Sequence, residues 1–113
     1  MSDDIRIRRK PGKWCLRAGG AVLGESTEVL ALSEGDYPEV LYFPRASIAM
    51  AMLEKTATQT TCPKKGIASY YAIHAKSSVI DDAGWSYEDP LETVAEIAGH
   101  IAFDTSKVTV EEL

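Results

Sequence analysis

Short runs of β-branched and aromatic residues follow one another along the chain, and glycine or proline separates many of them. The clearest run spans residues 67–74. Successive side chains of a strand point to opposite faces of a sheet, so this run predicts one face with Ile67, Ser69, Tyr71 and Ile73 and another with Ala68, Tyr70, Ala72 and His74. Runs this short bury apolar surface only when they pair into sheets. The pattern therefore predicts a mainly β chain.

The same signals predict further strands at residues 5–8, 14–17, 21–23, 28–32, 40–43, 56–61, 77–80, 85–87, 101–103 and 108–110. Gly19-Gly20 lies between two of these runs and can adopt positive φ, which is typical of a tight hairpin turn. Residues 33–38 and residues 81–84 are rich in turn-forming types, so we expect loops at both places.

Two short helices are also expected. Residues 46–53 carry apolar side chains at helical spacing, and residues 91–98 follow a proline that suits a first helical turn. For the second helix, Asp89 is the expected N-cap and Glu92 the partner that completes a capping box. Gly99 is expected to end that helix in a left-handed conformation.

The length of 113 residues is close to the common size of one domain, so we expect residues 1–113 to form a single domain. Many short strands and two short helices favour two facing antiparallel sheets, or a partly open barrel, with the helices at the edges. The apolar fraction is ordinary for a globular protein, and disorder is not expected.

The formal net charge of −5 argues against general nucleic-acid binding, which requires a basic surface. No apolar run is long enough to span a bilayer, so no membrane partner is expected. Residues 1–10 are charged and lack the apolar segment of a secretory signal, which predicts a cytoplasmic location.

The two cysteines and two histidines are Cys15, Cys62, His74 and His100. The cysteines form no Cys-x-x-Cys pair, and the spacing of these four residues matches no local zinc-ligand pattern. We therefore predict no metal site, and the residues name no cofactor. A disulfide is not expected in a reducing cytoplasm.

Three stretches combine aromatic, cationic and turn residues in a way that a plain core does not require, namely residues 42–45, 61–71 and 85–103. Guanidinium and ammonium groups bind carboxylate or phosphate oxygens, and aromatic rings stack on planar ligands. The sequence thus predicts a pocket with aromatic walls and a basic floor for a small anionic or planar ligand. The candidate binding residues are Tyr42, Arg45, Lys64, Lys65, Tyr71, Trp85 and His100.

These stretches also carry a family resemblance, through the motifs Val40 to Arg45, Thr61 to Gly66, Tyr70-Tyr71, Trp85 to Tyr87 with Pro90, and Ile97 to Phe103 followed by Val108 to Val110. From about residue 14 to its last residue, the chain resembles the small bacterial proteins of domain-of-unknown-function family 427, some of which are labelled nucleotidyltransferases. The resemblance implies a mainly β fold of the tent-like sandwich type found in several zinc-binding domains. The zinc does not carry over, because the paired Cys-x-x-Cys is missing.

Enzymatic function is the first alternative. Nucleotidyl transfer requires carboxylates that converge on Mg²⁺, but the adjacent pairs Asp81-Asp82 and Glu88-Asp89 would diverge on a strand. Thiol chemistry is a second route, because the neighbouring lysines would lower the pKa of Cys62 and His74 or His100 could act as a base. Cys62 and His100 are accordingly the candidate catalytic residues.

A protein-interaction module without a pocket is the second alternative, and its exposed sheet edges would favour a homodimer. In that case the candidate residues have structural roles. Trp85 would anchor a core, one of Tyr70 and Tyr71 would only pack, and Arg45 would pair with a carboxylate such as Glu54 or Asp89.

Overall fold

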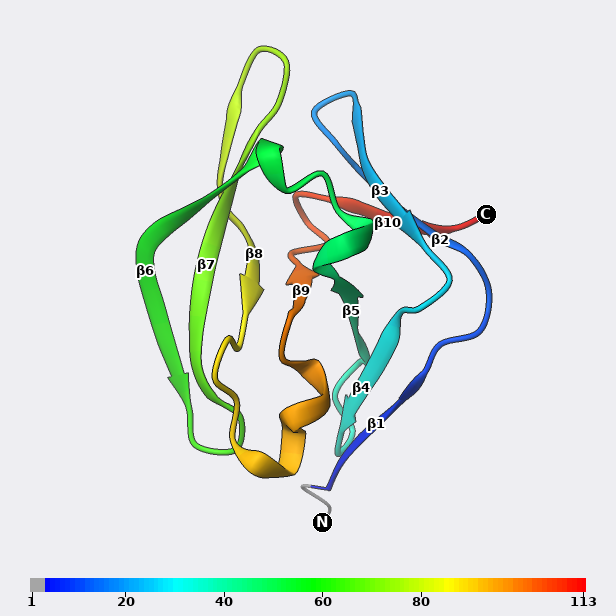
Figure 1. The fold of residues 1–113 in the computed structure, drawn as a ribbon, viewed down its shortest axis with the longest axis vertical. Coiled ribbons are helices and arrows are strands. Elements are labelled where there is room, and N and C mark those ends of the chain that lie inside the picture. The colour runs from blue at the N-terminus through cyan, green and yellow to red at the C-terminus, as the bar shows by residue number, and fades with distance from the viewer. Residues whose placement is uncertain (1–3) are drawn as a thin grey trace.

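The computed structural model describes residues 4–113, which contain ten strands and three short 3₁₀ segments (Figure 1). The strands are β1 (Ile5–Arg9), β2 (Trp14–Ala18), β3 (Ala21–Ser26), β4 (Leu30–Glu34), β5 (Val40–Pro44), β6 (Leu53–Cys62), β7 (Gly66–His74), β8 (Val79–Ser86), β9 (His100–Phe103) and β10 (Thr109–Glu112). The 3₁₀ segments are η1 (Arg45–Ser47), η2 (Met50–Met52) and η3 (Glu92–Ile97). The mainly β fold with two antiparallel sheets is confirmed. Residues 1–3, which the expected domain includes, lie outside the described part.

The larger sheet has seven strands in the order β1-β4-β5-β9-β8-β7-β6, and every neighbouring pair is antiparallel. Its register places one row of directly paired residues across five strands, in the order Leu30, Tyr42, Ala102, Trp85 and Tyr70. Directly paired residues project from the same face of a sheet. Chain segments distant in sequence therefore deliver their aromatic side chains to one surface.

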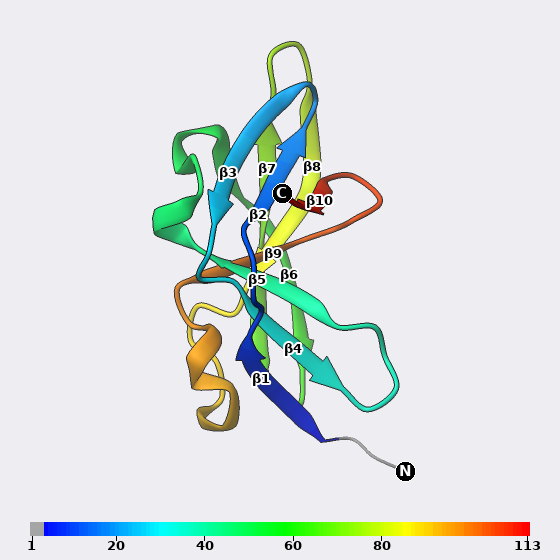
Figure 2. The ribbon, with the colours of Figure 1, turned by 90° about the vertical axis from the view of Figure 1, so that its right-hand side faces the viewer.

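The smaller sheet, in the order β10-β2-β3, crosses in front of β7 and β8 in Figure 2. Its β2–β3 turn contains Gly19 and Gly20 at φ of 55° and 79°, which confirms the expected tight hairpin. A Cβ added to Gly19 would lie 2.5 Å from the Cβ of Ala75 in the β7–β8 turn. The tips of the two hairpins are therefore in contact, at the upper end of the molecule in Figure 1.

Apolar clusters cover both faces of the larger sheet. The cluster between the two sheets includes Leu16, Leu23, Phe43, Tyr71, Ile73, Ile101 and Phe103. In it, the rings of Phe43 and Phe103 meet edge to face with centroids 6.4 Å apart. The cluster on the opposite face includes Tyr42, Ala68, Ala102, and Val94 and Ile97 of η3. The alternation predicted for residues 67–74 thus separates Tyr70 and Tyr71 onto different faces.

The expected helix at residues 46–53 is wrong. Two separate 3₁₀ turns, η1 and η2, occupy this segment, and Leu53 already belongs to β6. The backbone between the turns is extended at Ile48, which bridges to Gly24 of β3. A segment this short gains little from helical hydrogen bonds alone, so its contact with the smaller sheet decides its conformation.

The second expected helix is only partly correct. Residues 92–97 form the 3₁₀ segment η3, and Val94 has a non-helical φ of −124°. The N-cap is Leu91 without any side-chain hydrogen bond, so the predicted capping box of Asp89 and Glu92 is wrong. Gly99 does follow the segment with a φ of 75°, as expected for its terminating residue.

The turn expected at residues 81–84 is also wrong, because β8 continues through it to Ser86. Ala72 of β7 faces the three residues Asp81 to Ala83, so the strand bulges instead of turning. Asp82 occupies the left-handed region at φ 47°, a conformation that Asp tolerates better than most residues. Turn-forming residues in this stretch therefore mark a bulge.

No helical segment within residues 4–113 has the length and apolarity needed to cross a membrane.

Candidate functional site: an aromatic pocket on the larger sheet

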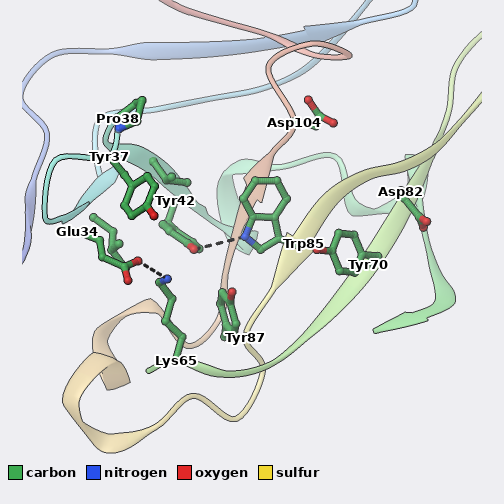
Figure 3. A pocket seen from close by; sticks show the side chains of 12 residues that line it. Glu34, Tyr37, Pro38, Tyr42, Lys65, Tyr70, Asp82, Trp85, Tyr87 and Asp104 are labelled. Carbon is green, nitrogen blue, oxygen red and sulfur yellow. Dashed lines mark hydrogen bonds and ion pairs between the residues drawn. The ribbon is translucent and has the colours of Figure 1, made fainter. Parts of the chain in front are cut away.

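Aromatic side chains from three strands meet on the face of the larger sheet that carries η3 (Figure 3). The indole Nε1 of Trp85 donates a hydrogen bond of 3.4 Å to the hydroxyl of Tyr42. On the other side of Trp85, the ring of Tyr70 lies at a centroid distance of 6.3 Å and an angle of 38°. The side chains of Tyr42, Trp85 and Tyr70 border an open space on this face of the sheet.

This space is a pocket of about 330 Å³. Its lining is Leu32, Glu34, Tyr37, Pro38, Val40, Tyr42, Lys65, Tyr70, Asp82, Trp85, Tyr87 and Asp104. Tyr37, which is 75% exposed, comes from the β4–β5 loop, whereas Tyr87 directly follows β8 and is buried. Most aromatic side chains of the lining therefore belong to strands or directly follow one, whereas Tyr37 belongs to a loop.

An ion pair occupies one side of the pocket. Lys65, from the β6–β7 turn, places its Nζ 2.7 Å from Oε1 of Glu34 at the end of β4, and the lysine side chain is only 12% exposed. Burial lowers the pKa of Lys65, but the hydrogen bond to Glu34 and the nearby acidic groups together outweigh it, so the pKa is raised overall. The ammonium group is thus held charged and already paired. Its Nζ also lies 3.7 Å from Sγ of Cys62.

Two further carboxylates line the pocket and form no ion pair among the described residues. Asp82 accepts hydrogen bonds from the hydroxyls of Thr56 and Thr58, at 2.8 and 2.9 Å. Asp104 accepts from the hydroxyl and backbone N–H of Ser106, both through Oδ1, and these bonds hold the pKa of Asp104 below its usual value. The pocket is therefore aromatic with an acidic rim.

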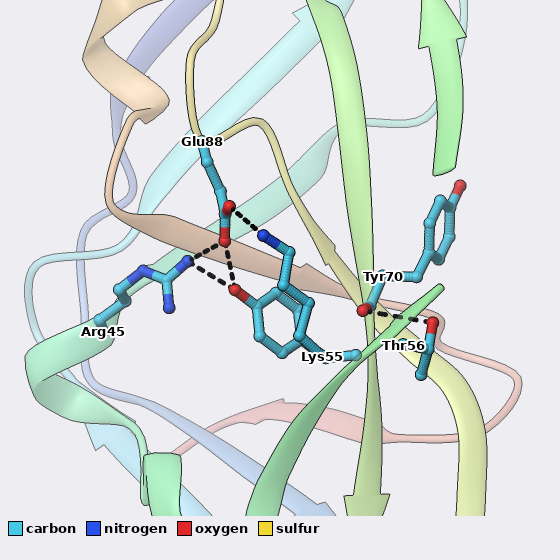
Figure 4. Close-up of polar contacts among 6 residues, drawn as sticks. Arg45, Lys55, Thr56, Tyr70 and Glu88 are labelled. Atoms are coloured by element: carbon cyan, nitrogen blue, oxygen red, sulfur yellow. Dashed lines mark hydrogen bonds and ion pairs between the residues drawn. The ribbon is translucent and has the colours of Figure 1, made fainter. Parts of the chain in front are cut away.

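Arg45 belongs to a different cluster, shown in Figure 4. Its guanidinium donates to the hydroxyl of Tyr71 and to Glu88, both at 2.8 Å, and lies 5.4 Å from the centre of the Tyr71 ring. Lys55 donates to the other carboxylate oxygen of Glu88 at 2.7 Å, and the Tyr71 hydroxyl also donates to Glu88. The hydrogen bonds from Lys55 and then Tyr71 hold the pKa of Glu88 below its usual value. The partner of Arg45 is therefore Glu88 rather than Glu54 or Asp89.

The remaining candidates lie apart from both clusters. Lys64 lines a shallow hollow beside Pro63 and Leu91, with its Nζ 3.9 Å from Oε2 of Glu34. His100 begins β9, and its Nδ1 donates to the carbonyl oxygen of Ala98 at 3.0 Å. Neither residue lines the aromatic pocket.

The predicted binding residues are thus only partly assembled. Tyr42, Lys65 and Trp85 line one pocket, Arg45 and Tyr71 share a network on the other face, and Lys64 and His100 stand separately, so the basic floor is absent from this pocket. Sequence reasoning left out Tyr37, Tyr70 and Tyr87 from the binding set. The alternation of residues 67–74 did separate Tyr70 from Tyr71, but it did not say which face was open.

The described contacts bring Cys62 next to a lysine but bring neither histidine to it. Cys62 is half-buried beside Lys65, whereas the imidazole of His74 bonds to Glu54 at 2.7 Å and His100 bonds to backbone. Within residues 4–113, no group of three or more His, Cys, Asp or Glu side chains is arranged to hold a metal ion.

The family model described as a domain of unknown function, DUF427, matches residues 6–112. The chain belongs to the DUF427 family. This confirms the resemblance found in the sequence, and the match spans β1 to β10 and hence every residue of the aromatic pocket. Comparison with curated proteins gave no match. The description of this family specifies no reaction.

Proposed function

We propose that this DUF427 protein binds a small planar ligand in the aromatic pocket beside Trp85. The supporting observation is that Tyr37, Tyr42, Tyr70, Trp85 and Tyr87 all line one pocket of about 330 Å³. Aromatic lining with a few polar groups is typical of small-molecule sites, and this volume lies at the lower end of their usual range. A ligand of one or two fused rings is the expected size.

The charges favour a planar ligand over an anionic one. Lys65 is the cation in the lining, and it is paired with Glu34 at 2.7 Å, whose other carboxylate oxygen lies 3.9 Å from Nζ of Lys64. An anion would have to displace this carboxylate and would also meet Asp82 and Asp104. Ring stacking on Trp85 and Tyr70 requires no such rearrangement.

Binding is also better supported than a reaction at this site. The charged side chains of the lining are already engaged, because Glu34 pairs with Lys65 and because Asp82 and Asp104 accept hydrogen bonds from hydroxyl groups. Burial raises the pKa of Tyr42 far above its usual value, so its hydroxyl stays protonated and serves as a hydrogen-bonding group.

A ligand-binding experiment tests the proposal with Tyr70→Ala. Ligand-observed NMR would measure dissociation constants for indole, quinoline and adenine with the wild-type protein and the variant. Aromatic pairing contributes about 0.5–1.5 kcal/mol beyond area burial, so we expect binding to weaken about 2–10-fold. Tyr70 is only partly buried, which makes its loss tolerable for the fold.

Tyr71→Phe is the matched control, because Tyr71 is the next residue but faces the other side of the sheet. The control should bind the planar probes with wild-type affinity. Equal affinities for wild type and Tyr70→Ala, or an effect of Tyr71→Phe as large as that of Tyr70→Ala, would place the binding elsewhere.

A further inference from the structure

The aromatic pocket adjoins a second, larger hollow of about 720 Å³. The two hollows share Tyr37, Pro38, Val40, Trp85 and Asp104 as lining residues. Trp85 is therefore a wall of both hollows. We call the two adjoining hollows together the bipartite groove, with the aromatic pocket as its first compartment and the larger hollow as its second.

The second compartment differs chemically from the first. It lies where the smaller sheet meets the larger one, because Trp14 of β2 and Val110 of β10 line it together with Leu41 of β5 and Phe103 of β9. Its acidic residue Glu39 is paired with Arg8 and Lys10. The surface that remains is largely apolar, so it suits a hydrocarbon chain or an aliphatic group.

A charged group marks the junction of the compartments. Asp104 lines both, and only Oδ1 of its carboxylate carries hydrogen bonds in the described part of the chain. Asp82, at the first compartment, has hydroxyl partners but no cation. Aromatic faces attract cations. The rings and these carboxylates therefore both favour a positively charged ligand.

We propose that the bipartite groove binds an amphiphile that has a planar, positively charged head and an apolar tail. The head stacks between the aromatic side chains of the first compartment, its charge lies near Asp104, and the tail occupies the second compartment beside Trp14 and Val110. This inference rests on the proposed function and adds the charge and the tail to it.

Isothermal titration calorimetry with three probes tests the positive charge and the apolar tail separately. The probes are N-methylquinolinium, which has the charged head alone, N-hexylquinolinium, which adds a tail, and neutral 2-hexylquinoline. Burial of the added methylene groups should make N-hexylquinolinium bind at least about tenfold more tightly than N-methylquinolinium. The positive charge should make N-hexylquinolinium bind at least about fivefold more tightly than 2-hexylquinoline.

Substitutions at residues that line the groove show whether these differences in affinity arise there. Asp104→Asn should remove most of the preference for the charged head, whereas Asp81→Asn, which deletes an exposed carboxylate outside the groove, should preserve it.

Val110→Thr, which keeps the side-chain shape but adds a hydroxyl, should reduce the gain in affinity that the tail gives and leave the affinity for N-methylquinolinium unchanged.

The outcomes separate this inference from the proposed function. If all three probes bind equally and Tyr70→Ala weakens them, the planar site stands and the amphiphile proposal is wrong. Tighter binding of 2-hexylquinoline than of N-hexylquinolinium would overturn the cationic head, and equal affinity of the two quinolinium ions would overturn the tail. Failure of every planar probe, including indole and adenine, to bind at millimolar concentration would overturn both proposals.

Discussion

Glu88 shows how one carboxylate organises the polar network opposite the pocket. It accepts hydrogen bonds from Arg45, Lys55 and Tyr71, which come from three different parts of the chain. The side chains of Arg45 and Glu88 are each 34% exposed, so solvent screens the ion pair and its contribution to stability is small.

Replacing Glu88 with Gln should destabilise the protein by about 0.5–1 kcal/mol at pH 7, since the charge-assisted bonds become neutral. The pKa of Glu88 is lowered in the folded protein from its ordinary 4.5. Its contribution is therefore complete above that value and is lost as the pH falls through the folded-state pKa. Urea denaturation of wild type and Glu88→Gln at pH 7 and at acidic pH measures the difference, which should shrink with acidification.

Glu96→Gln is the control for this pH series, because it removes an exposed carboxylate that lies outside the network of Glu88. Its stability relative to wild type should hardly change with pH. A gap between wild type and Glu88→Gln that stays constant or widens in acid would contradict the assigned role of the carboxylate.

The same residues show how far the sequence predicts the site. Alternation along β7 correctly predicted that Tyr70 and Tyr71 face opposite sides. It could not predict that η3 and the β4–β5 loop leave Tyr70 beside a pocket, because those segments are distant in sequence. Arg45 was expected at the ligand for its chemistry alone, but the fold supplies Glu88 as a nearer partner.

At the scale of elements, the connection between the sheets depends on Gly24. An added Cβ on this residue would lie 2.0 Å from the carbonyl oxygen of Ser47 and 3.2 Å from the Cα of Ile48. The contact is with backbone, which cannot move aside as a flexible side chain would. β3 and the segment between η1 and η2 are therefore in direct main-chain contact.

Gly24→Ala should consequently cost about 1–3 kcal/mol, the range found for overpacked interiors. Chemical denaturation monitored by circular dichroism measures this loss. Val22→Ala is the control on the same strand, because Val22 is 56% exposed, and it should cost less than about 1 kcal/mol. A Gly24→Ala protein as stable as wild type would mean that the two segments separate at little cost.

This contact also explains why the sequence was misleading at residues 46–53. Apolar residues at helical spacing favoured a helix, but Ile48 is instead extended and bridges to Gly24. In the same way, Asp81 to Gly84 was expected to be a turn although β8 passes through it as a bulge. Local patterns predicted most strands, whereas these two departures depend on partners that are distant in sequence.

For the molecule as a whole, one apolar cluster joins the two sheets, with Leu16 and Leu23 on one side and Phe43 and Ile101 on the other. Neither sheet can bury these residues without its partner. The two sheets are therefore expected to unfold together, as small proteins with a shared core usually do.

The two tryptophans test this expectation, because Trp14 lies in the smaller sheet and Trp85 in the larger. In Trp85→Phe, the fluorescence of Trp14 reports the smaller sheet, and in Trp14→Phe the fluorescence of Trp85 reports the larger. In each variant the fluorescence transition in urea should coincide with the transition measured by far-UV circular dichroism. A Trp14 transition at lower urea than the circular-dichroism transition would show that the smaller sheet separates first.

The ion pair of Lys65 and Glu34 connects two parts of the larger sheet that are not neighbours. It joins β4 to the β6–β7 turn, although three other strands lie between β4 and β7 in the sheet. The pair therefore links two parts of the sheet that the backbone hydrogen bonds do not connect directly. If β4 and the β6–β7 turn moved apart, the ammonium group of Lys65, only 12% exposed, would lose this carboxylate partner, so the ion pair opposes their separation.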